Sequence, residues 1–318
     1  MTHNWQPSAT LETLKKRALM LQSIRAFFTQ RNVLEVDTPV LSRAAITDPQ
    51  IESFSTFYNR KEYFLNTSPE FYMKRLLAAG SGDIFQVAKV FRDDENGRFH
   101  SPEFTMLEWY RLGLDHHQLM DEMEALLVEL MQDRKVAIDR LSYQQVFLNQ
   151  LNIDPLEADF EELKKCAESK SIETPQGMID DKDVWLDWLM VSVIAPGFAK
   201  EKFTFLYDYP ASQASLSRLD KNDSRKANRF ELFYGELELA NGFYELTDSS
   251  EQSKRFEHDN EIRQQRGQKL MPVDECLLDA LKSGLPECSG VAIGIDRLMM
   301  VVMGADHINE VISFGDEF

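Results

Sequence analysis

Two strand-like segments joined by a long polar stretch constrain the fold of this chain most. Residues 84–91 and 104–112 are rich in β-branched and aromatic side chains, whereas residues 92–103 are mostly polar or charged. Such runs favour strands, and consecutive strands commonly pair as an antiparallel hairpin. The segment therefore predicts a long-looped hairpin in which Arg92 leaves the first strand. The competing interpretation is a charged hairpin that is merely solvated.

Helices are predicted before and after this hairpin in the sequence. Apolar residues at three- and four-residue spacing predict an amphipathic helix from Leu11 to about Asn32, followed by a short strand at 33–36. Ser68, Pro69 and Glu70 predict the start of a second helix, which runs to about Gly80, because serine caps, proline suits the first turn and an acid complements the helix dipole. Further helices are expected at about 115–133, 142–151, 159–170 and 183–194.

The C-terminal part returns to strand patterns. Strands are expected between residues 203 and 246, helices at about 249–266 and 274–283, and a glycine-punctuated strand at 289–295 that enters a last helix. We therefore expect one α+β domain over residues 1–318, with a mainly antiparallel β-sheet flanked by helices. A helical insertion is expected at about 115–200.

Charge and composition narrow the class of protein. The 318 residues carry a formal net charge of −18, from 53 acidic and 35 basic side chains, so the long-range field repels nucleic acid. No long uncharged apolar run could cross a bilayer, and residues 1–10 lack the pattern of a secretory signal, so a cytoplasmic protein is expected. Three cysteines without a CxxC pair argue against a disulfide framework and a zinc site.

Three further segments place unusual residues next to strand signals: 30–41, 91–110 and 290–297. Each has an ordinary structural alternative, namely a helix–strand connection, a solvated hairpin and a tight strand–helix turn. In this order, however, they resemble the three signature motifs of class II aminoacyl-tRNA synthetases. Residues 67–75, 101–110 and 238–246 also resemble lysyl-tRNA synthetases, and the resemblance covers about 20–110 and 200–315.

The activation that this resemblance implies has clear chemical demands. Joining a carboxylate to the α-phosphate of ATP brings two anions together, and Arg92 fits the role of a guanidinium fixed between them. Arg297 fits a second guanidinium that holds the terminal phosphate. Mg²⁺ prefers carboxylate oxygens, so Glu238 and Glu245 are predicted to bridge the metal to ATP. The alternative is that both are solvated strand glutamates.

The resemblance implies further ATP contacts. His100 is expected near the phosphates, and Phe104 is expected to stack on adenine, unless it is only a core phenylalanine. Asp94 stands where glutamate is usual, and Ser101 where asparagine is common, so both are retained as predicted contacts. The remaining predicted contacts are Asp93, Leu239 and Gly294.

A doubly cationic amino acid requires buried acids and an aromatic wall, because an unpaired ammonium is costly to desolvate. By the resemblance, Glu70 faces the α-ammonium, and Glu108, Tyr110 and Glu245 face the side-chain ammonium. Asn241 would help Arg92 with the carboxylate, and Phe243 would pack on the methylenes. Ser68 and Pro69 complete the predicted substrate contacts.

Lysyl-tRNA synthetases carry an anticodon-binding barrel before the first motif, which here begins at Gln30, so no anticodon-binding domain is expected. The layout resembles truncated paralogues that attach (R)-β-lysine to a lysine side chain of translation elongation factor P, and Ser68, in place of alanine, favours them. A hydroxyl there could favour a shifted amine or simply cap the helix. The family also implies a homodimer. Two alternatives stay open: a shortened enzyme that charges tRNA, and a non-catalytic synthetase-like regulator.

Overall fold

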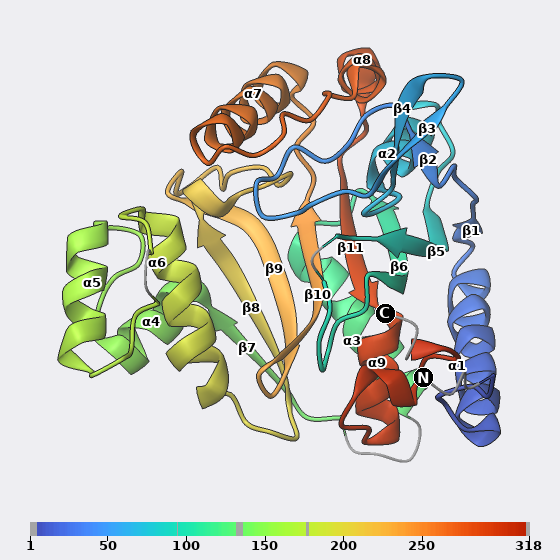
Figure 1. The fold of residues 1–318 in the computed structure, drawn as a ribbon, viewed down its shortest axis with the longest axis horizontal. Coiled ribbons are helices and arrows are strands. Elements are labelled where there is room, and N and C mark those ends of the chain that lie inside the picture. Colours follow the sequence, from blue (N-terminus) through green and yellow to red (C-terminus); the bar gives the residue numbers. More distant parts are fainter. Residues whose placement is uncertain (1–4, 94, 132–135, 176–177, 316–318) are drawn as a thin grey trace.

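A computed structural model describes residues 5–93, 95–131, 136–175 and 178–315. Within them, an eight-stranded sheet forms the centre of the molecule (Figure 1). In spatial order its strands are β1 (Leu34–Glu35), β5 (Ile84–Phe91), β6 (Glu103–Leu112), β11 (Cys288–Gly294), β10 (Leu237–Tyr244), β9 (Lys226–Tyr234), β8 (Phe203–Pro210) and β7 (Ile138–Ser142). Neighbours are antiparallel except at the two edges, where β1–β5 and β7–β8 are parallel. The predicted mainly antiparallel α+β fold is therefore confirmed.

The predicted hairpin is the pair β5–β6. Its register runs without a break from Ile84 opposite Tyr110 to Phe91 opposite Glu103. β6 also pairs with β11, so it lies inside the sheet, and Leu107 and Trp109 are fully buried. Because side chains alternate along a strand, Glu108 and Tyr110 point to the opposite face from Trp109.

Three helices cover the face that carries Trp109: α1 (Leu11–Gln30), α3 (His116–Met131) and α9 (Ile295–Met303). Thr10 caps α1 by accepting the backbone N–H of Thr13 at 3.1 Å. Apolar side chains from these helices and from the sheet form the main core, among them Ile24, Phe28, Phe85, Leu126 and Leu298. This packing holds the sheet so that its other face can carry the site.

A second core lies beside the first, on the left of Figure 1. It contains α4 (Tyr143–Leu151), α5 (Phe160–Ser169) and α6 (Lys182–Leu189), and the last continues through a π-helical turn, Met190–Ile194, and a 3₁₀ turn, Ala195–Gly197. The separate helical cluster thus begins later than the predicted residue 115. The reason is that α3 packs in the main core and β7 pairs with β8.

Most of the remaining elements lie toward one end of the sheet, whereas the short turn Ile308–Glu310 lies beside α9 (Figure 1). A small sheet in the order β2-β4-β3, which the sequence patterns did not predict, consists of β2 (Leu41–Ser42), β4 (Lys61–Leu65) and β3 (Ser55–Tyr58). Beside it are α2 (Glu70–Ala78), α7 (Ser249–Gln265) and α8 (Glu275–Gly284), and two 3₁₀ turns span Ala211–Gln213 and Ile308–Glu310. Within the described ranges, no helix combines the length and the apolar character needed to cross a membrane.

Candidate active site

Strand register brings the predicted substrate residues into two neighbouring rows. In the first row, Glu108 of β6 lies opposite Ala292 of β11, which in turn lies opposite Asn241 of β10. In the second row, Tyr110 lies opposite Gly290, and Gly290 lies opposite Phe243. Residues far apart in the sequence therefore share one surface, because three adjacent strands carry them.

A buried carboxylate anchors this surface. Ser68 Oγ donates to Glu108 Oε1 at 2.5 Å, and the Tyr110 hydroxyl donates to Glu108 Oε2 at 3.0 Å. Ser68 Oγ also accepts the backbone N–H of Glu70 at 3.0 Å, so it caps the start of α2 as well. The helix-cap interpretation of Ser68 agrees with this contact, and its bond to Glu108 places its hydroxyl beside the predicted substrate residues.

A lysine that the sequence analysis did not select lies between two predicted substrate acids. Lys74 Nζ is 2.7 Å from Glu70 Oε1 and 2.6 Å from Glu245 Oε2, and the Lys74 side chain is almost completely buried. Burial opposes the charge of Lys74, but the carboxylates of Glu245 and Glu70 outweigh it and raise the pKa of Lys74. Lys74 therefore stays an ammonium and joins α2 to the end of β10.

Glu108 and Glu245 hold protons more tightly than exposed acids do. Burial, and then the charge of Glu70, raise the pKa of Glu108 to about 8. Burial also raises the pKa of Glu245 to about 7, against the opposing effect of Lys74. A cationic ligand would restore the charge of these carboxylates, because an ammonium nearby favours the ionised form.

Gly290 leaves room for these side chains. A Cβ at this position would lie 2.2 Å from Tyr110 Cε1 and 2.5 Å from Glu245 Oε1. Such distances are far inside van der Waals contact, so the strand can pass between the two groups only as glycine. Gly290 of the third motif is therefore explained by the close packing of Tyr110 and Glu245 around it.

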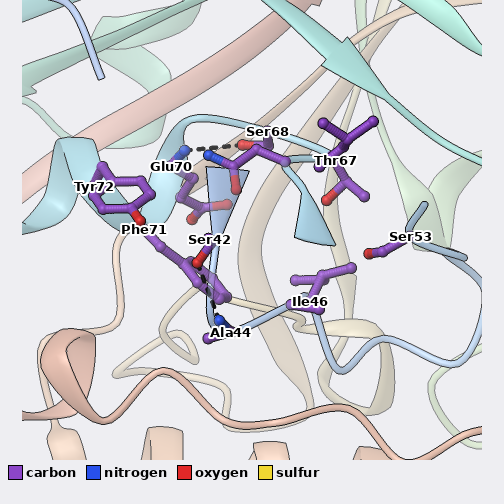
Figure 2. A pocket seen from close by; sticks show the side chains of 12 residues that line it. Ser42, Ala44, Ile46, Ser53, Thr67, Ser68, Glu70, Phe71 and Tyr72 are labelled. Atoms are coloured by element: carbon purple, nitrogen blue, oxygen red, sulfur yellow. Dashed lines mark hydrogen bonds between the residues drawn. The ribbon is translucent and has the colours of Figure 1, made fainter. Parts of the chain in front are cut away.

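Figure 2 shows the pocket wall contributed by segments before and within α2. Ile46 and Ser53 lie near Thr67, while Glu70 and Tyr72 extend from α2 on the other side (Figure 2). The wall joins the small sheet, the connection that follows β2 and the start of α2. The lining residues are Ser42, Ala44, Ala45, Ile46, Ser53, Leu65, Asn66, Thr67, Ser68, Glu70, Phe71 and Tyr72.

The two predicted catalytic arginines come from different motifs. Arg92 follows β5, its guanidinium carbon lies 5.3 Å from the centre of the Phe104 ring, and its Nη1 is 3.1 Å from Glu95 Oε1. Its Nε is buried without a hydrogen-bond partner among the described residues. Arg297, in the first turn of α9, donates from Nε to Phe99 O and from Nη1 to Glu238 O. Both side chains are held in place yet retain donors.

Glu238 of β10 lies close enough to both arginines, Arg92 and Arg297, for their charges to act on it. Enclosure by the protein, and then the charge of Glu231, raise the pKa of Glu238 to about 7, while Arg297, Arg229 and Arg92 act in the opposite direction. His100 lies in the same neighbourhood. Burial and the charge of Arg297 lower its pKa. Glu238 nevertheless keeps solvent exposure, and water weakens the effect of the surrounding protein on its charge, so the direction of its pKa shift is firmer than its size.

The predicted metal pair requires a correction. Glu238 lies at the start of β10 and Glu245 just beyond its end, so seven residues of strand, about 23 Å, separate their backbones. Glu245 is instead bound to Lys74 in the substrate pocket. The structure therefore does not bring Glu238 and Glu245 together around one ion.

Other predicted contacts have mixed outcomes. The Asn241 Oδ1 atom accepts a hydrogen bond from Arg229 Nε at 3.2 Å, so the described contact of Asn241 is to Arg229 and not to Arg92. Phe243 is buried with the Arg229 guanidinium 6.0 Å from its ring. Asp94 lies outside the described residues. Ser101 and Leu239 are buried, Gly294 precedes α9, Pro69 precedes α2, and the Asp93 backbone N–H donates to Glu52 O.

Arg229 and Glu231 were missed along with Lys74. Arg229 Nη2 is 2.5 Å from Glu231 Oε1, and the Arg229 guanidinium lies 4.5 Å from the Tyr209 ring. Arg229 and Glu231 are two residues apart on β9, so their side chains lie on the same face of the sheet as the site. The sequence shows this spacing once the strand is known. Lys74 also had a signal, since it follows Glu70 by four residues on a predicted helix.

Comparison with known proteins gives a consistent result. A family model described as tRNA synthetases class II (D, K and N) matches residues 4–317. The elongation factor P–(R)-β-lysine ligase of Vibrio atlanticus (strain LGP32) is 48% identical over 320 residues, which cover 99% of this chain and 98% of the relative. Proteins of the same name from Vibrio cholerae (48% over 317 residues, 98% and 97% covered) and Photorhabdus laumondii (47% over 319 residues, 98% and 98%) are similar as well.

Proposed function

The chain belongs to the class II tRNA synthetases of the D, K and N group, and from this premise we propose that it is an ATP-dependent ligase for elongation factor P. It activates (R)-β-lysine, or lysine, as the adenylate and transfers it to a lysine side chain of that factor. The observation that carries the proposal is the near full-length similarity, at 47–48% identity, to relatives that bear this name.

The charge of the substrate pocket supports an amino acid with two amines. Glu70, Glu108 and Glu245 provide three carboxylates, whereas Lys74 provides one ammonium. The surplus of acid matches a substrate with two ammonium groups, because each buried charge needs a partner. Phe243 supplies an apolar surface for the methylenes between them.

In the first step, a carboxylate oxygen of the amino acid attacks the α-phosphorus of ATP. The new O–P bond forms as the bond to the β-phosphate oxygen breaks, and pyrophosphate leaves. The buried, unpartnered Nε of Arg92 is available to an anionic oxygen, and Arg297 is fixed at the start of α9 to hold a phosphate. Positioning and charge neutralisation supply most of the catalysis in such a transfer.

In the second step, a neutral lysine ε-amine of the acceptor attacks the carbonyl carbon of the adenylate. The C–N bond of an amide forms, the C–O bond to the phosphate breaks, AMP leaves and the amine loses a proton. No side chain of this protein needs to become acylated. Because the adenylate must be reached from outside, the acceptor lysine has to enter at the open side of the site.

We place Mg²⁺ with Glu238 and Glu231 and no longer with Glu245. The donor set fits, since Glu238 pairs with Phe233 across β9 and β10, and Glu231 lies two residues before Phe233 on the same face of β9. After burial, the charge of Glu231 is the next cause that raises the pKa of Glu238. Oxygen ligands of this kind suit Mg²⁺, which supplies neutralisation of phosphate charge when it is bound.

We also propose a homodimer, as the family implies. Leu34, Val40 and Leu41, which lie within the first motif, are exposed apolar side chains. Light scattering of the purified protein tests this assembly, and a monomer at micromolar concentration would contradict it.

The acceptor is tested by the intact mass of elongation factor P after incubation with enzyme, ATP, Mg²⁺ and (R)-β-lysine. The expected result is a gain of one β-lysyl group that disappears when ATP is omitted. A labelled amino acid that appears on tRNA but not on elongation factor P would favour the shortened tRNA synthetase. The absence of pyrophosphate exchange with any lysine isomer would contradict both enzymatic functions.

A further inference from the structure

The connection between β2 and β3 is neither a helix nor a strand, and it lines the pocket of Figure 2 together with the predicted substrate residues Ser68 and Glu70. Ala44, Ala45, Ile46 and Ser53 from this connection line the pocket in Figure 2. An irregular segment has few backbone hydrogen bonds of its own, so other parts of the molecule have to fix its position. We call residues 43–54 the wall segment.

Arg263 of α7 binds the wall segment through an unusual number of backbone contacts. Its Nε donates to Thr47 O at 2.9 Å, and its Nη2 donates to Asp48 O at 2.9 Å and to Ile51 O at 2.6 Å. Its Nη1 donates to Glu52 Oε1 at 3.0 Å and to Lys269 O at 3.1 Å. All three guanidinium nitrogens are therefore used, and the side chain is completely buried.

Two neighbouring side chains support the same attachment. Gln268 Nε2 donates to Pro49 O at 2.9 Å and to Glu52 Oε1 at 3.1 Å. Thr47 Oγ1 donates to Asp259 Oδ2 on α7 at 2.6 Å. The end of α7 thus holds the wall segment from residue 47 to residue 52, directly beside the pocket-lining residues.

The wall segment is also joined to the turn that carries Arg92. Glu52 forms an isolated antiparallel bridge with Asp93, in which the Asp93 N–H donates to Glu52 O at 3.0 Å. Asp93 follows Arg92 directly. A shift of the wall segment would therefore reach both the amino-acid pocket and the position of the catalytic guanidinium.

We propose that Arg263 is a positioning residue for amino-acid activation: it sets the wall segment, and through Glu52 and Asp93 the place of Arg92, without touching a substrate. The proposal rests on the ligase function proposed above and adds a determinant outside the three motifs. Arg263 would thereby let α7 fix the shape of the amino-acid pocket, although this helix contributes no residue to the pocket lining in Figure 2.

The shape of the guanidinium explains why arginine is needed here. Five N–H groups in one plane can reach carbonyls on several sides at once, whereas a lysine ammonium has three donors on a single nitrogen. Arg263→Lys keeps the positive charge beside Glu52 but cannot satisfy Thr47, Asp48 and Ile51 together. A role that needed only charge would survive this change.

The experiment compares Arg263→Lys with Arg266→Lys in ATP–pyrophosphate exchange, with (R)-β-lysine and ATP varied separately. Arg266 ends the same helix and is exposed, so the control makes the same chemical change away from the wall segment. We expect kcat/KM for the amino acid to fall by about 10- to 100-fold in Arg263→Lys, mainly through KM, because small displacements of a positioned group have effects of this size. The KM for ATP should change far less, and Arg266→Lys should match wild type.

A milder variant covers the case in which Arg263→Lys does not fold. Gln268→Ala removes two donors to the same segment, and the amino-acid KM should rise in the same direction by a smaller factor. The unfolding midpoint of each variant shows whether the whole protein is destabilised. Hydrogen exchange of residues 43–54 should increase in both variants. Unchanged amino-acid KM in a folded Arg263→Lys or Gln268→Ala protein would overturn the proposal. Failure of wild type to catalyse exchange would instead refute the ligase function.

Discussion

At the scale of single residues, Glu108 shows how burial and hydrogen bonding act on one carboxylate in opposite directions. Burial and the charge of Glu70 raise its pKa to about 8, although Ser68 and Tyr110 both donate hydrogen bonds that favour the ionised form. Desolvation dominates because the side chain is almost fully removed from water. A positive charge placed beside Glu108 would therefore favour its ionised form.

This leads to a prediction about pH and stability. The pKa of Glu108 rises from 4.5 to about 8 on folding, so the folded protein binds more protons than the unfolded chain between these values. The free energy of unfolding should therefore fall as pH rises through this window, by about 1 to 3 kcal/mol for this residue. Urea denaturation of the ligand-free protein between about pH 5 and about pH 8 measures the slope.

Glu108→Gln provides the control, because the amide keeps the shape but does not titrate. The difference between the wild-type and variant pH profiles should isolate the contribution of Glu108. Binding of (R)-β-lysine should show the opposite trend in wild type and strengthen toward pH 8, since the ionised carboxylate pairs with the ammonium. Parallel stability profiles for the two proteins would contradict this account.

At the scale of elements, the hairpin β5–β6 and the strand β11 could be predicted because their patterns are local. The run from Phe104 to Leu112 is apolar and aromatic, and the glycines at 290 and 294 mark the third motif. Register then follows from pairing, which places Glu108 and Tyr110 beside Gly290. Local pattern and family resemblance together were sufficient to select residues that the structure brings side by side.

The metal pair could not be predicted in the same way. Glu238 lies in β10 and Glu245 just beyond its end, and their separation becomes clear only when the bounds of β10 are known. Glu231 belongs to the preceding strand, and nothing local in the sequence distinguishes it from other strand acids. The contacts of Arg263 depend on the path of an irregular segment about 210 residues earlier in the chain, which no periodic pattern records.

Helix α2 offers a direct comparison between a buried and an exposed ion pair. Lys74 and Glu70 are four residues apart, with side chains that are 2% and 13% exposed, whereas the equivalent pair Lys16 and Glu12 on α1 is 50% and 77% exposed. Lys74→Met should lower the free energy of unfolding by about 3 kcal/mol or more, because it leaves two carboxylates without their cation. Lys16→Met should change it by only a few tenths of a kcal/mol.

Chemical denaturation near neutral pH measures both values. The loss in Lys74→Met should shrink at acidic pH, because Glu245, whose pKa burial raises to about 7, is then protonated and no longer needs a partner. The same variant should bind the amino acid less well, since Glu245 would lose the contact that fixes its carboxylate. Equal losses in the two lysine variants would show that burial of the pair does not matter.

At the scale of the whole molecule, the sheet connects the two hydrophobic cores. Neighbouring residues on β8 and β9 alternate between them: Phe205 and Leu232 belong to the main core, while Leu206 and Phe233 belong to the core around α4–α6. These strands are therefore covered on both faces. The cluster α4–α6 is not joined to the rest of the molecule by a linker alone, because it packs on β8 and β9, which belong to the eight-stranded sheet.

We predict that the two cores unfold together. Loss of α4–α6 would expose Leu206 and Phe233, both nearly fully buried, and leave one face of β8 and β9 in water. Hydrogen exchange of peptides from α3 and from α4 should therefore show the same denaturant midpoint in rising urea. If peptides from α4–α6 exchange at clearly lower urea while α3 stays protected, the helical cluster opens as a separate unit, and the shared strands do not couple the cores.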